Sequence, residues 1–467
     1  MRYETAHFDV AIVGAGPAGV RAAETLLRHN IKPILIDEAM APGGQVYRQP
    51  PAGAERPAED IYGFETRKAK AIHAVIGAAG TRIDYRPNTL VWNAARADEK
   101  VRLDTIQDGA AGTVIVDRLI LATGAVDRVV PFPGWTVPGV FTLGAAQIAL
   151  KSQGIAIGGK VALVGAGPLL PLLAAQYIKA GLTPAIVLDV TPFSAKVLAL
   201  PRLLVEPATL CKGLHYTLAV MRAKLPRAAG VRAIRVLGQD RVTGLVYRDR
   251  AGGEHHVDCD AVAASFGLRS EAQLADLAGC RFIYEATSRQ WQPWSDISGR
   301  SSVSNIYLAG DGAGIAGADA AELAGERAAL AILEDTGVMV DGDRISRVEM
   351  WLAWHRVFRR GLEAAYPFPA HLLDVIEPDT TLCRCEGITV AALRRSVREQ
   401  APVDVSQLKA FTRIGMGRCQ GRMCALAAAE LLAADANVPI EAAGRLRAQP
   451  PVKPIPLDAA VQAERTP

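Results

Sequence analysis

Two glycine-rich turns, each lying between a short apolar run and a helical pattern, constrain the fold of this chain more than any other feature. The mostly apolar residues 8–13 lead into the sequence GAGPAG at 14–19, and residues 20–27 then show helical spacing. The pattern returns at residues 161–164, followed by GAGPLL at 165–170. A strand, a glycine turn and a helix in this order are typical of a parallel α/β sheet that binds a nucleotide. The sequence therefore predicts two Rossmann-like units.

The first turn has the residues that a dinucleotide site requires. Gly14 permits the tight turn, Gly16 lets the backbone approach a pyrophosphate, and Gly19 permits close packing of helix and strand. Pro17 and Ala18 complete the turn at the start of the helix. A turn with a purely structural role is the alternative, but the strand and helix on either side favour a nucleotide site.

An acidic pair follows the next predicted strand. Residues 33–36 form this strand, and it ends in Asp37-Glu38. An acidic side chain at this distance from the glycine turn hydrogen-bonds a ribose hydroxyl in dinucleotide sites. We expect Asp37 or Glu38 to have this role.

The second turn is altered, so nucleotide binding there is doubtful. Gly165 and Gly167 are present, and Asp189 follows the strand at 185–188, but Leu170 replaces the third glycine and Pro171 comes directly after it. The leucine separates helix and strand, and the proline removes an N–H group near the helix start. Two interpretations stay open: a weak nucleotide site, and a domain that keeps its shape without hydride transfer.

Four cysteines near the C-terminus indicate a metal centre. Cys383 and Cys385 form a Cys-x-Cys step, and Cys419 and Cys424 enclose four residues. Four thiolates are the ligands of iron–sulfur clusters, and Cys-x-Cys is tighter than the usual zinc spacing. Zinc and a disulfide are the alternatives. Nearby glycines and basic residues favour a negatively charged [2Fe–2S] cluster: Gly415, Gly417, Gly421, Arg384, Lys409, Arg413, Arg418 and Arg422.

Composition excludes several other functions. The chain has 467 residues, half of them apolar, and a formal net charge of only +4. This charge is too small to indicate a nucleic-acid or membrane-surface partner. No apolar run reaches the roughly 18 residues of a membrane-spanning helix, and no signal peptide precedes the first strand. We expect a cytoplasmic protein, with peripheral attachment to the inner membrane through a complex left open.

Two further segments belong with the first glycine turn: the step Ala122-Thr123-Gly124 after an apolar run, and Gly310-Asp311 after a predicted strand. Taken together, the three resemble the flavoprotein disulfide reductases, which have two dinucleotide-binding domains. In that family the glycine turn binds the FAD pyrophosphate, an Ala-Thr-Gly strand passes under the adenosine half, and a late aspartate hydrogen-bonds the ribityl chain. A Gly-Gly-Gln loop lies against the isoalloxazine in thioredoxin-reductase-like members. The corresponding residues here are Gly43, Gly44, Gln45, Ala122, Thr123, Gly124, Gly310 and Asp311.

One departure from this family decides the functional interpretation. The redox cysteine pair that disulfide reductases carry beside the flavin has no counterpart here, so electrons must leave by another route. The segments 383–386 and 412–424 resemble the [2Fe–2S] domain of bacterioferritin-associated ferredoxin. Over nearly its whole length the chain resembles the α-type subunit, with FAD and [2Fe–2S], of the D-hydroxyproline dehydrogenase, octopine and nopaline (opine) oxidase and hydrogen cyanide synthase family.

The resemblance implies cofactors and partners. FAD and [2Fe–2S] are expected in this chain, and an FMN at an interface with a partner is a further option. The partner is expected to be an FAD-dependent β subunit of the D-amino-acid-oxidase type that oxidises the substrate C–N bond, and a small ferredoxin-like subunit is a second option. Because the substrate pocket is then on the partner, no catalytic residue is assigned in this chain.

We predict an α/β fold with two disulfide-reductase-type domains and a small helical [2Fe–2S] domain. Residues 1–150 and 266–335 form the FAD domain, 151–265 an inserted degenerate NAD(P)-type domain, 336–379 a helical linker, 380–436 the cluster domain and 437–467 an extended Pro-rich tail. Trp351, Trp354 and Phe358 have the spacing of one buried stripe on the linker helix.

The function predicted is electron transfer within a multi-subunit amine or amino-acid dehydrogenase. A flavin accepts two electrons together, whereas a two-iron cluster accepts one at a time, so the pair suits export of single electrons. Two rival functions are a stand-alone NAD(P)H-dependent reductase and a non-enzymatic redox sensor or scaffold.

Overall fold

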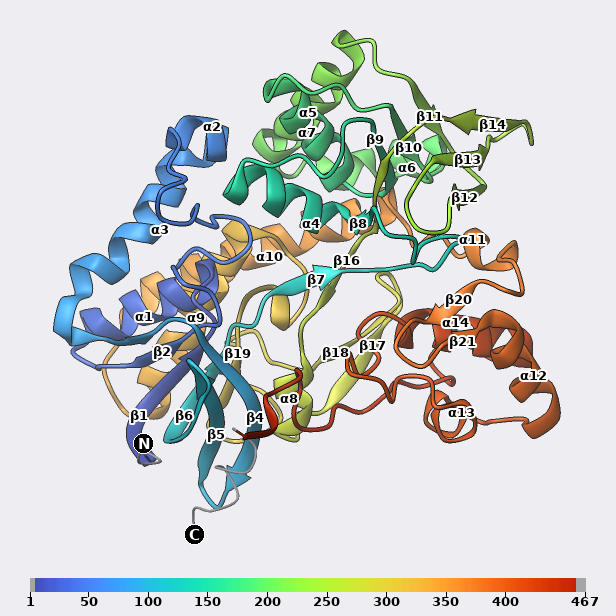
Figure 1. Ribbon diagram of the computed structural model, residues 1–467. Helices are drawn as coiled ribbons and strands as arrows, with labels where there is room; N and C mark the ends of the chain where they lie inside the picture. The colour runs from blue at the N-terminus through green and yellow to red at the C-terminus, as the bar shows by residue number, and fades with distance from the viewer. Residues whose placement is uncertain (1–4, 459–467) are drawn as a thin grey trace.

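The computed structural model describes residues 5–458; the end of the predicted tail, 459–467, lies outside the described residues. Two sheet-containing domains and a small helical domain are packed around a central pair of connecting strands (Figure 1). In Figure 1 the first domain, which begins with β1, lies at the lower left and the second domain lies above it. The small domain lies at the right, in orange and red. In the described part of the chain no helix is long and apolar enough to cross a membrane.

The first domain has a seven-stranded sheet in the order β3-β2-β1-β6-β5-β4, with β19 pairing β6. The strands β1, β2, β3, β6 and β19 run parallel, whereas β4 to β6 form an antiparallel meander. Parallel strands are buried on both faces, which explains the continuous apolar runs at β1 and β2. The strands are Thr5–Val13 (β1), Ile34–Ile36 (β2), Asp84–Arg86 (β3), Thr89–Ala97 (β4), Lys100–Gln107 (β5), Ala110–Leu121 (β6) and Ile306–Leu308 (β19).

Helices α1 and α9 cover one face of this sheet. They pack so closely that a Cβ at Gly325 on α9 would overlap the carbonyl oxygen of Ala18 on α1. The late strand β19 pairs β6, which in turn pairs β1, so the chain returns to the sheet that carries the first glycine turn. The helices of this domain are Pro17–Arg28 (α1), Ala58–Tyr62 (α2), Thr66–Ala79 (α3), Gln273–Leu277 (α8) and Ala318–Asp335 (α9), and its hairpin strands are Phe282–Glu285 (β17) and Gln290–Pro293 (β18).

The second domain has a five-stranded parallel sheet in the order β11-β10-β9-β15-β8 and a three-stranded antiparallel sheet, β12-β13-β14. Its strands are Val140–Thr142 (β8), Val161–Ala166 (β9), Ile186–Asp189 (β10), Arg227–Ala229 (β11), Ala233–Leu237 (β12), Gly244–Arg248 (β13), Glu254–Val257 (β14) and Ala261–Phe266 (β15). Its helices are Leu143–Ile148 (α4), Leu169–Lys179 (α5), Phe193–Leu203 (α6) and Pro207–Arg222 (α7), and α4 continues into a π-helical turn, Ala149–Gln153.

The boundary between the two domains differs from the one we predicted at residue 150. Strand β8 pairs β15, so residues 140–148 belong to the second sheet. A three-residue strand after Pro138 and Gly139 carries no local signal of the sheet that it joins. The connection itself is a two-stranded ribbon of Ala125–Asp127 (β7) and Leu268–Ser270 (β16), at the centre of Figure 1.

The helical linker begins with the long helix α10 (Gly342–Ala365), which packs on α6 and α9. The predicted buried stripe on it is wrong for two of its three residues. Phe358 is buried, but Trp351 and Trp354 are 51% and 49% exposed and their rings lie 6.2 Å apart. Three- and four-residue spacing places side chains on one face but does not decide whether another element covers that face. A short helix, α11 (His371–Asp374), follows.

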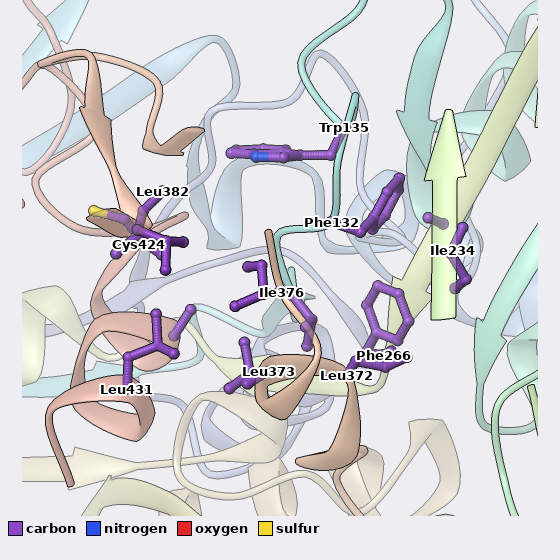
Figure 2. Packing of buried hydrophobic residues seen from close by; sticks show 14 of the residues in the cluster. Phe132, Trp135, Ile234, Phe266, Leu372, Leu373, Ile376, Leu382, Cys424 and Leu431 are labelled. Carbon is purple, nitrogen blue, oxygen red and sulfur yellow. The ribbon is translucent and has the colours of Figure 1, made fainter. Parts of the chain in front are cut away.

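The small domain contains two short strands and three helices: Thr381–Cys383 (β20), Ile388–Thr389 (β21), Val390–Gln400 (α12), Val405–Thr412 (α13) and Ala425–Ala436 (α14). Its core is continuous with that of the second domain. Figure 2 shows Leu372, Leu373 and Ile376 between Phe132, Ile234 and Phe266 on one side and Leu382, Cys424 and Leu431 on the other. Trp135 joins the two parts directly, because its Nε1 donates to the carbonyl oxygen of Thr381 at 2.5 Å.

Candidate functional site

The first glycine turn is closed by backbone contacts that only glycine allows. Gly14 has φ +108°, and a Cβ there would overlap the carbonyl oxygen of Ala122 at the end of β6. Gly16 is the N-cap of α1 and Pro17 its first residue, and no side chain caps the helix. The free N–H groups at the start of α1 can therefore receive an anionic group, as a pyrophosphate site requires.

The two acidic residues after β2 have different positions. The carboxylate of Asp37 accepts hydrogen bonds from the backbone N–H of Ala15 at 2.5 Å and of Ala39 at 2.6 Å, and burial raises its pKa. Asp37 thereby ties the end of β2 to the glycine turn. The side chain of Glu38 is 53% exposed and pairs with Lys453 of the C-terminal tail. The sequence predicts that one of them meets a ribose, and the structure brings both to the turn.

The Gly-Gly-Gln loop folds back onto the same turn. The N–H of Gly43 donates to the carbonyl oxygen of Ala15 at 2.8 Å, and a Cβ on Gly44, which has φ +60°, would lie 2.8 Å from the Cα of Gly16. Gln45 is exposed, and its Oε1 accepts from Arg48 Nη2 at 3.2 Å. Arg48 Nε is buried without a hydrogen-bond partner among residues 5–458, as a group that meets a bound cofactor would be.

The late segments complete this site. The N–H of Ala122 donates to the carbonyl oxygen of Val13 at 2.8 Å, and Thr123 Oγ1 donates to the carbonyl oxygen of Glu271. Gly124 follows with φ +73°. Gly310 and Asp311 lie between β19 and α9, where Asp311 Oδ1 accepts from two backbone N–H groups at the start of the helix. Asp37, Gly43, Gly44 and Ala122 contact the glycine turn directly, and the cradle of glycine backbones fits a bound dinucleotide.

One residue near this site had no sequence signal. Lys151, in the π-helical turn of the second domain, donates from Nζ to the carbonyl oxygen of Val46 at 3.0 Å. Burial lowers the pKa of its amine to about 8. A single lysine more than a hundred residues from the Gly-Gly-Gln loop could not be assigned to the loop from spacing.

The second glycine turn has the close backbone approach of a glycine turn, but the carboxylate of Asp189 after β10 is already hydrogen-bonded within the chain. A Cβ on Gly165 would overlap the carbonyl oxygen of Ser265, and Leu170 is buried at 2% exposure. Asp189 Oδ1 accepts from the N–H of Thr191 at 2.8 Å, and Oδ2 is paired with Lys196. Both carboxylate oxygens of Asp189 are therefore engaged and its side chain is only 18% exposed, whereas Glu38 is 53% exposed and pairs with Lys453 through Oε2.

The four cysteines of the small domain lie together as two pairs, Cys383 with Cys424 and Cys385 with Cys419. None of the seven cysteines forms a disulfide. Hydrogen bonds from the partner thiol and from the backbone lower the pKa of Cys383 to about 5, and the shared proton raises the pKa of Cys424. Burial raises the pKa of Cys385.

Two neighbouring thiol pairs are the arrangement that a two-iron cluster requires. A tetrahedral zinc needs four donors around one atom, whereas each iron of a [2Fe–2S] cluster takes two. The thiol set therefore fits the cluster. Cys383 and Cys424 are buried, whereas Cys385 is exposed and Cys419 partly so, which leaves one side of the site near the surface.

Close backbone approach to the sulfurs depends on Gly417. A Cβ there would overlap the Cβ of Cys385 and lie 3.3 Å from its Sγ. Two of the nearby arginines are held by acids, Arg413 by Glu386 at 2.9 Å and Arg422 by Glu271 at 3.2 Å. These pairs reduce the positive charge that the sequence indicates around the cysteines.

An open groove of about 520 Å³ lies between the cysteine loop and Glu38, one of the two acidic residues after β2. It is lined by Glu38 and Leu90 of the first domain, by Arg418 and Cys419 of the cluster domain, and by tail residues that include Lys453. The tail lies across the first sheet, because Val452 is 3% exposed and its N–H donates to the carbonyl oxygen of Trp92 at 3.0 Å. The groove therefore borders both Cys419 and the acidic residue Glu38.

Comparison with known families assigns both parts of the chain. The profile of the pyridine nucleotide-disulphide oxidoreductase family matches residues 8–328, and that of the BFD-like [2Fe-2S] binding domain matches residues 381–434. The first match indicates FAD as a cofactor of the chain and the second a [2Fe–2S] cluster in the small C-terminal domain.

Similar proteins extend over nearly the whole chain. The opine oxidase A protein of Rhizobium meliloti is 38% identical over 98% of this chain and 88% of its own length. The hydrogen cyanide synthase protein HcnB of Pseudomonas aeruginosa is 33% identical over 96% of this chain and 97% of its own. The crystal structure of L-proline dehydrogenase from P. horikoshii shares the fold, with a TM-score of 0.74 and 20% identity over 98% of this chain and 80% of that one.

Proposed function

The chain belongs to the pyridine nucleotide-disulphide oxidoreductase family, in the group that includes the opine oxidase A proteins and HcnB, and we propose that it is the electron-transfer subunit of a multi-subunit dehydrogenase. The substrate of that enzyme would be an amine or amino acid of the opine or D-hydroxyproline type. A partner subunit with its own FAD would oxidise the C–N bond and pass the electrons to this chain. A bound flavin can take up two electrons and release them one at a time to a two-iron cluster.

The shared groove is the observation that carries this proposal. Glu38, at the nucleotide site, and Cys419, at the cluster, line one cavity of about 520 Å³. The tail fixes this arrangement, since Lys453 pairs with Glu38 while the carbonyl oxygen of Val452 accepts from Arg422 Nη1 at 2.6 Å. Cys385 is exposed, so an electron acceptor could approach the cluster site from the surface at this cysteine.

A partner subunit would explain an exposed apolar surface on α6, α7 and α10. Leu198 on α6 is 77% exposed, and Leu214 on α7 and Trp351 on α10 are each 51% exposed. Apolar patches of this kind mark protein–protein interfaces. The proposal includes a D-amino-acid-oxidase-like β subunit on this surface, an FMN at the interface, and attachment of a cytoplasmic complex to the inner membrane through its partners.

The rival function, a reductase that draws electrons from NAD(P)H, has less support. Asp189 is held by Lys196, so the second glycine turn offers a weak ribose site. A redox-active cysteine pair, as in a disulfide reductase, is also not formed by the three remaining cysteines. Cys211, Cys259 and Cys280 lie in separate segments, and Cys259 and Cys280 are buried.

Expression with and without the neighbouring reading frames tests the proposal. The chain alone should bind FAD and the cluster yet leave octopine, nopaline and D-hydroxyproline unoxidised with an artificial electron acceptor. The co-purified complex should oxidise one of this class of substrates. Oxidation at the full rate by the isolated chain would show that it is the catalytic component instead.

A further inference from the structure

A second, smaller cavity of about 130 Å³ lies on the other side of the cysteine loop. Its walls come from residues 269–276, from the β17–β18 hairpin and from residues 420–430 and 444–448. It therefore lies where the first domain, the cluster domain and the tail meet. A cavity of this volume is smaller than the usual volume of about 300 to 1,000 Å³ for drug-sized ligand pockets, so it suits a small molecule and not a nucleotide.

Several residues that line this cavity have buried polar atoms without a hydrogen-bond partner in the described part of the chain. Buried polar groups are nearly always satisfied, so a cluster of unsatisfied ones indicates a missing partner. Most of these groups are hydrogen-bond donors, which favours a ligand rich in acceptor oxygens. The atoms are Arg269 Nε, Arg269 Nη2, Ser270 Oγ, Gln273 Oε1, Tyr284 OH and Trp291 Nε1.

The two unsatisfied atoms of Arg269, Nε and Nη2, form one edge of its guanidinium group. Two other arginines of the chain bind carboxylates through this same edge. Nε–H and Nη2–H of a guanidinium point in parallel and match the two oxygens of a carboxylate. Arg289 uses these two atoms to bind Glu430, at 2.9 and 2.5 Å, and Arg344 uses them to bind Glu326, at 2.5 and 2.6 Å. At Arg269 the same edge has no partner within residues 5–458.

The other charged side chains around the cavity have partners. Arg289 holds Glu430, Arg422 holds Glu271, and both Arg445 and Arg447 hold Asp276. Burial lowers the pKa of Arg269, with the nearby carboxylate of Glu271 acting in the opposite direction, but a guanidinium stays charged in proteins. The cavity therefore presents one positive charge whose bidentate edge is free.

We propose that this cavity binds a small carboxylate anion, held side-on by Arg269 and hydrogen-bonded by Ser270 Oγ and Trp291 Nε1. The lining residues all belong to this chain and include none of the residues predicted for FAD, and the inference does not depend on the proposed function. A carboxylate is favoured over a cation because the unsatisfied groups are mostly donors, and the cavity volume limits the ligand to the size of acetate or pyruvate.

Isothermal titration of the full-length protein, loaded with FAD and cluster, tests this site. Acetate, glycolate and pyruvate are titrated at constant ionic strength, with pyruvamide as the uncharged counterpart of pyruvate and inorganic phosphate as a different oxyanion. At least one carboxylate should bind once per chain, whereas pyruvamide and phosphate should not. Arg269→Gln should weaken binding by at least about tenfold, since a bidentate contact to a charged group is lost.

Three variants separate the site from general effects on folding. Arg269→Lys keeps the charge without the bidentate edge and Trp291→Phe removes only an N–H donor, so both should weaken carboxylate binding while cluster absorbance is unchanged. Arg281→Gln, at an exposed position beside the same hairpin, should bind like the wild type. Failure of all three carboxylates to bind, equal binding of phosphate, or unchanged binding by Arg269→Lys and Trp291→Phe would overturn the proposal.

Discussion

Arg289 holds Glu430 through both oxygens of its carboxylate, with Nε to Oε1 at 2.9 Å and Nη2 to Oε2 at 2.5 Å. Arg289 lies in the β17–β18 hairpin of the first domain and Glu430 on helix α14, one turn and a half beyond the cluster ligand Cys424. Arg128, which is 4% exposed at its side chain, lies 3.7 Å from the same carboxylate. This buried group of charges joins the cluster domain to the flavoprotein body.

Replacing Glu430 by Gln should therefore loosen the cluster domain. The change keeps the side-chain shape but leaves the buried charge of Arg128 uncompensated. We expect a loss of about 2 to 3 kcal/mol in urea denaturation, below the full cost of breaking a buried pair because Arg289 is partly exposed. Glu59→Gln, which removes a fully exposed partner of Lys70, should have almost no effect. Equal effects of the two variants would contradict this role of Glu430.

Gly417→Ala should prevent cluster assembly. The added methyl group would overlap the Cβ of Cys385, so this cysteine would have to move away from Cys419. The purified variant should contain iron far below the wild-type level and lack visible absorbance beyond that of the flavin. Gly213→Ala, where a Cβ meets nothing within 4 Å, is the matched control and should keep the full iron content.

Lys151 should make thermal stability depend on pH. Its folded-state pKa is about 8, below the ordinary value of 10.5, so between these values the unfolded chain binds more protons than the folded one. Its contribution to stability therefore rises with pH across this window, and the burial cost is present in full below pH 8. Lys151→Met should raise the melting temperature more at pH 7.0 than at pH 9.5.

The exposed lysine Lys179 provides the control for this experiment. Lys179→Met should shift the melting temperature by a similar amount at the two pH values. A Lys151→Met shift that is the same at pH 7.0 and pH 9.5 would show that this amine is not buried in the folded protein.

The second glycine turn should not support fast hydride transfer. Because Asp189 is already bound by Lys196, the ribose of a nicotinamide nucleotide lacks its usual acceptor. In anaerobic stopped-flow experiments neither NADH nor NADPH should bleach the flavin at a rate comparable to turnover of the complex. Rapid bleaching by either nucleotide would favour the stand-alone reductase.

The sequence predicted those parts of the molecule whose signals are local. The two glycine turns, the acidic ends of β2 and β10 and the four cysteines all lie in short segments in which geometry requires particular residue types. The partners of these residues came from distant segments and had no such signal. Lys151, the Arg289–Glu430 pair and the unpartnered edge of Arg269 depend on how domains pack, which one sequence does not reveal.

The solvent exposure of side chains on a helix could also not be predicted from the spacing of apolar residues. The spacing of Trp351 and Trp354 placed them correctly on one face of α10, but the described elements leave that face half exposed. Strand β8 was assigned to the first domain because a three-residue strand is too short to show which sheet completes it. In both cases the missing information is a tertiary contact, which lies outside any local window.

In the function proposed here, electrons pass from the flavin of this chain to a cluster held by Cys383, Cys385, Cys419 and Cys424. Freeze-quench electron paramagnetic resonance of the assembled complex, mixed anaerobically with its amine substrate, can follow this transfer. The reduced-cluster signal should appear within one turnover, and Cys419→Ser should abolish both this signal and reduction of the external acceptor. A cluster that stays oxidised while the acceptor is reduced at the full rate would show that electrons leave the flavin by another route.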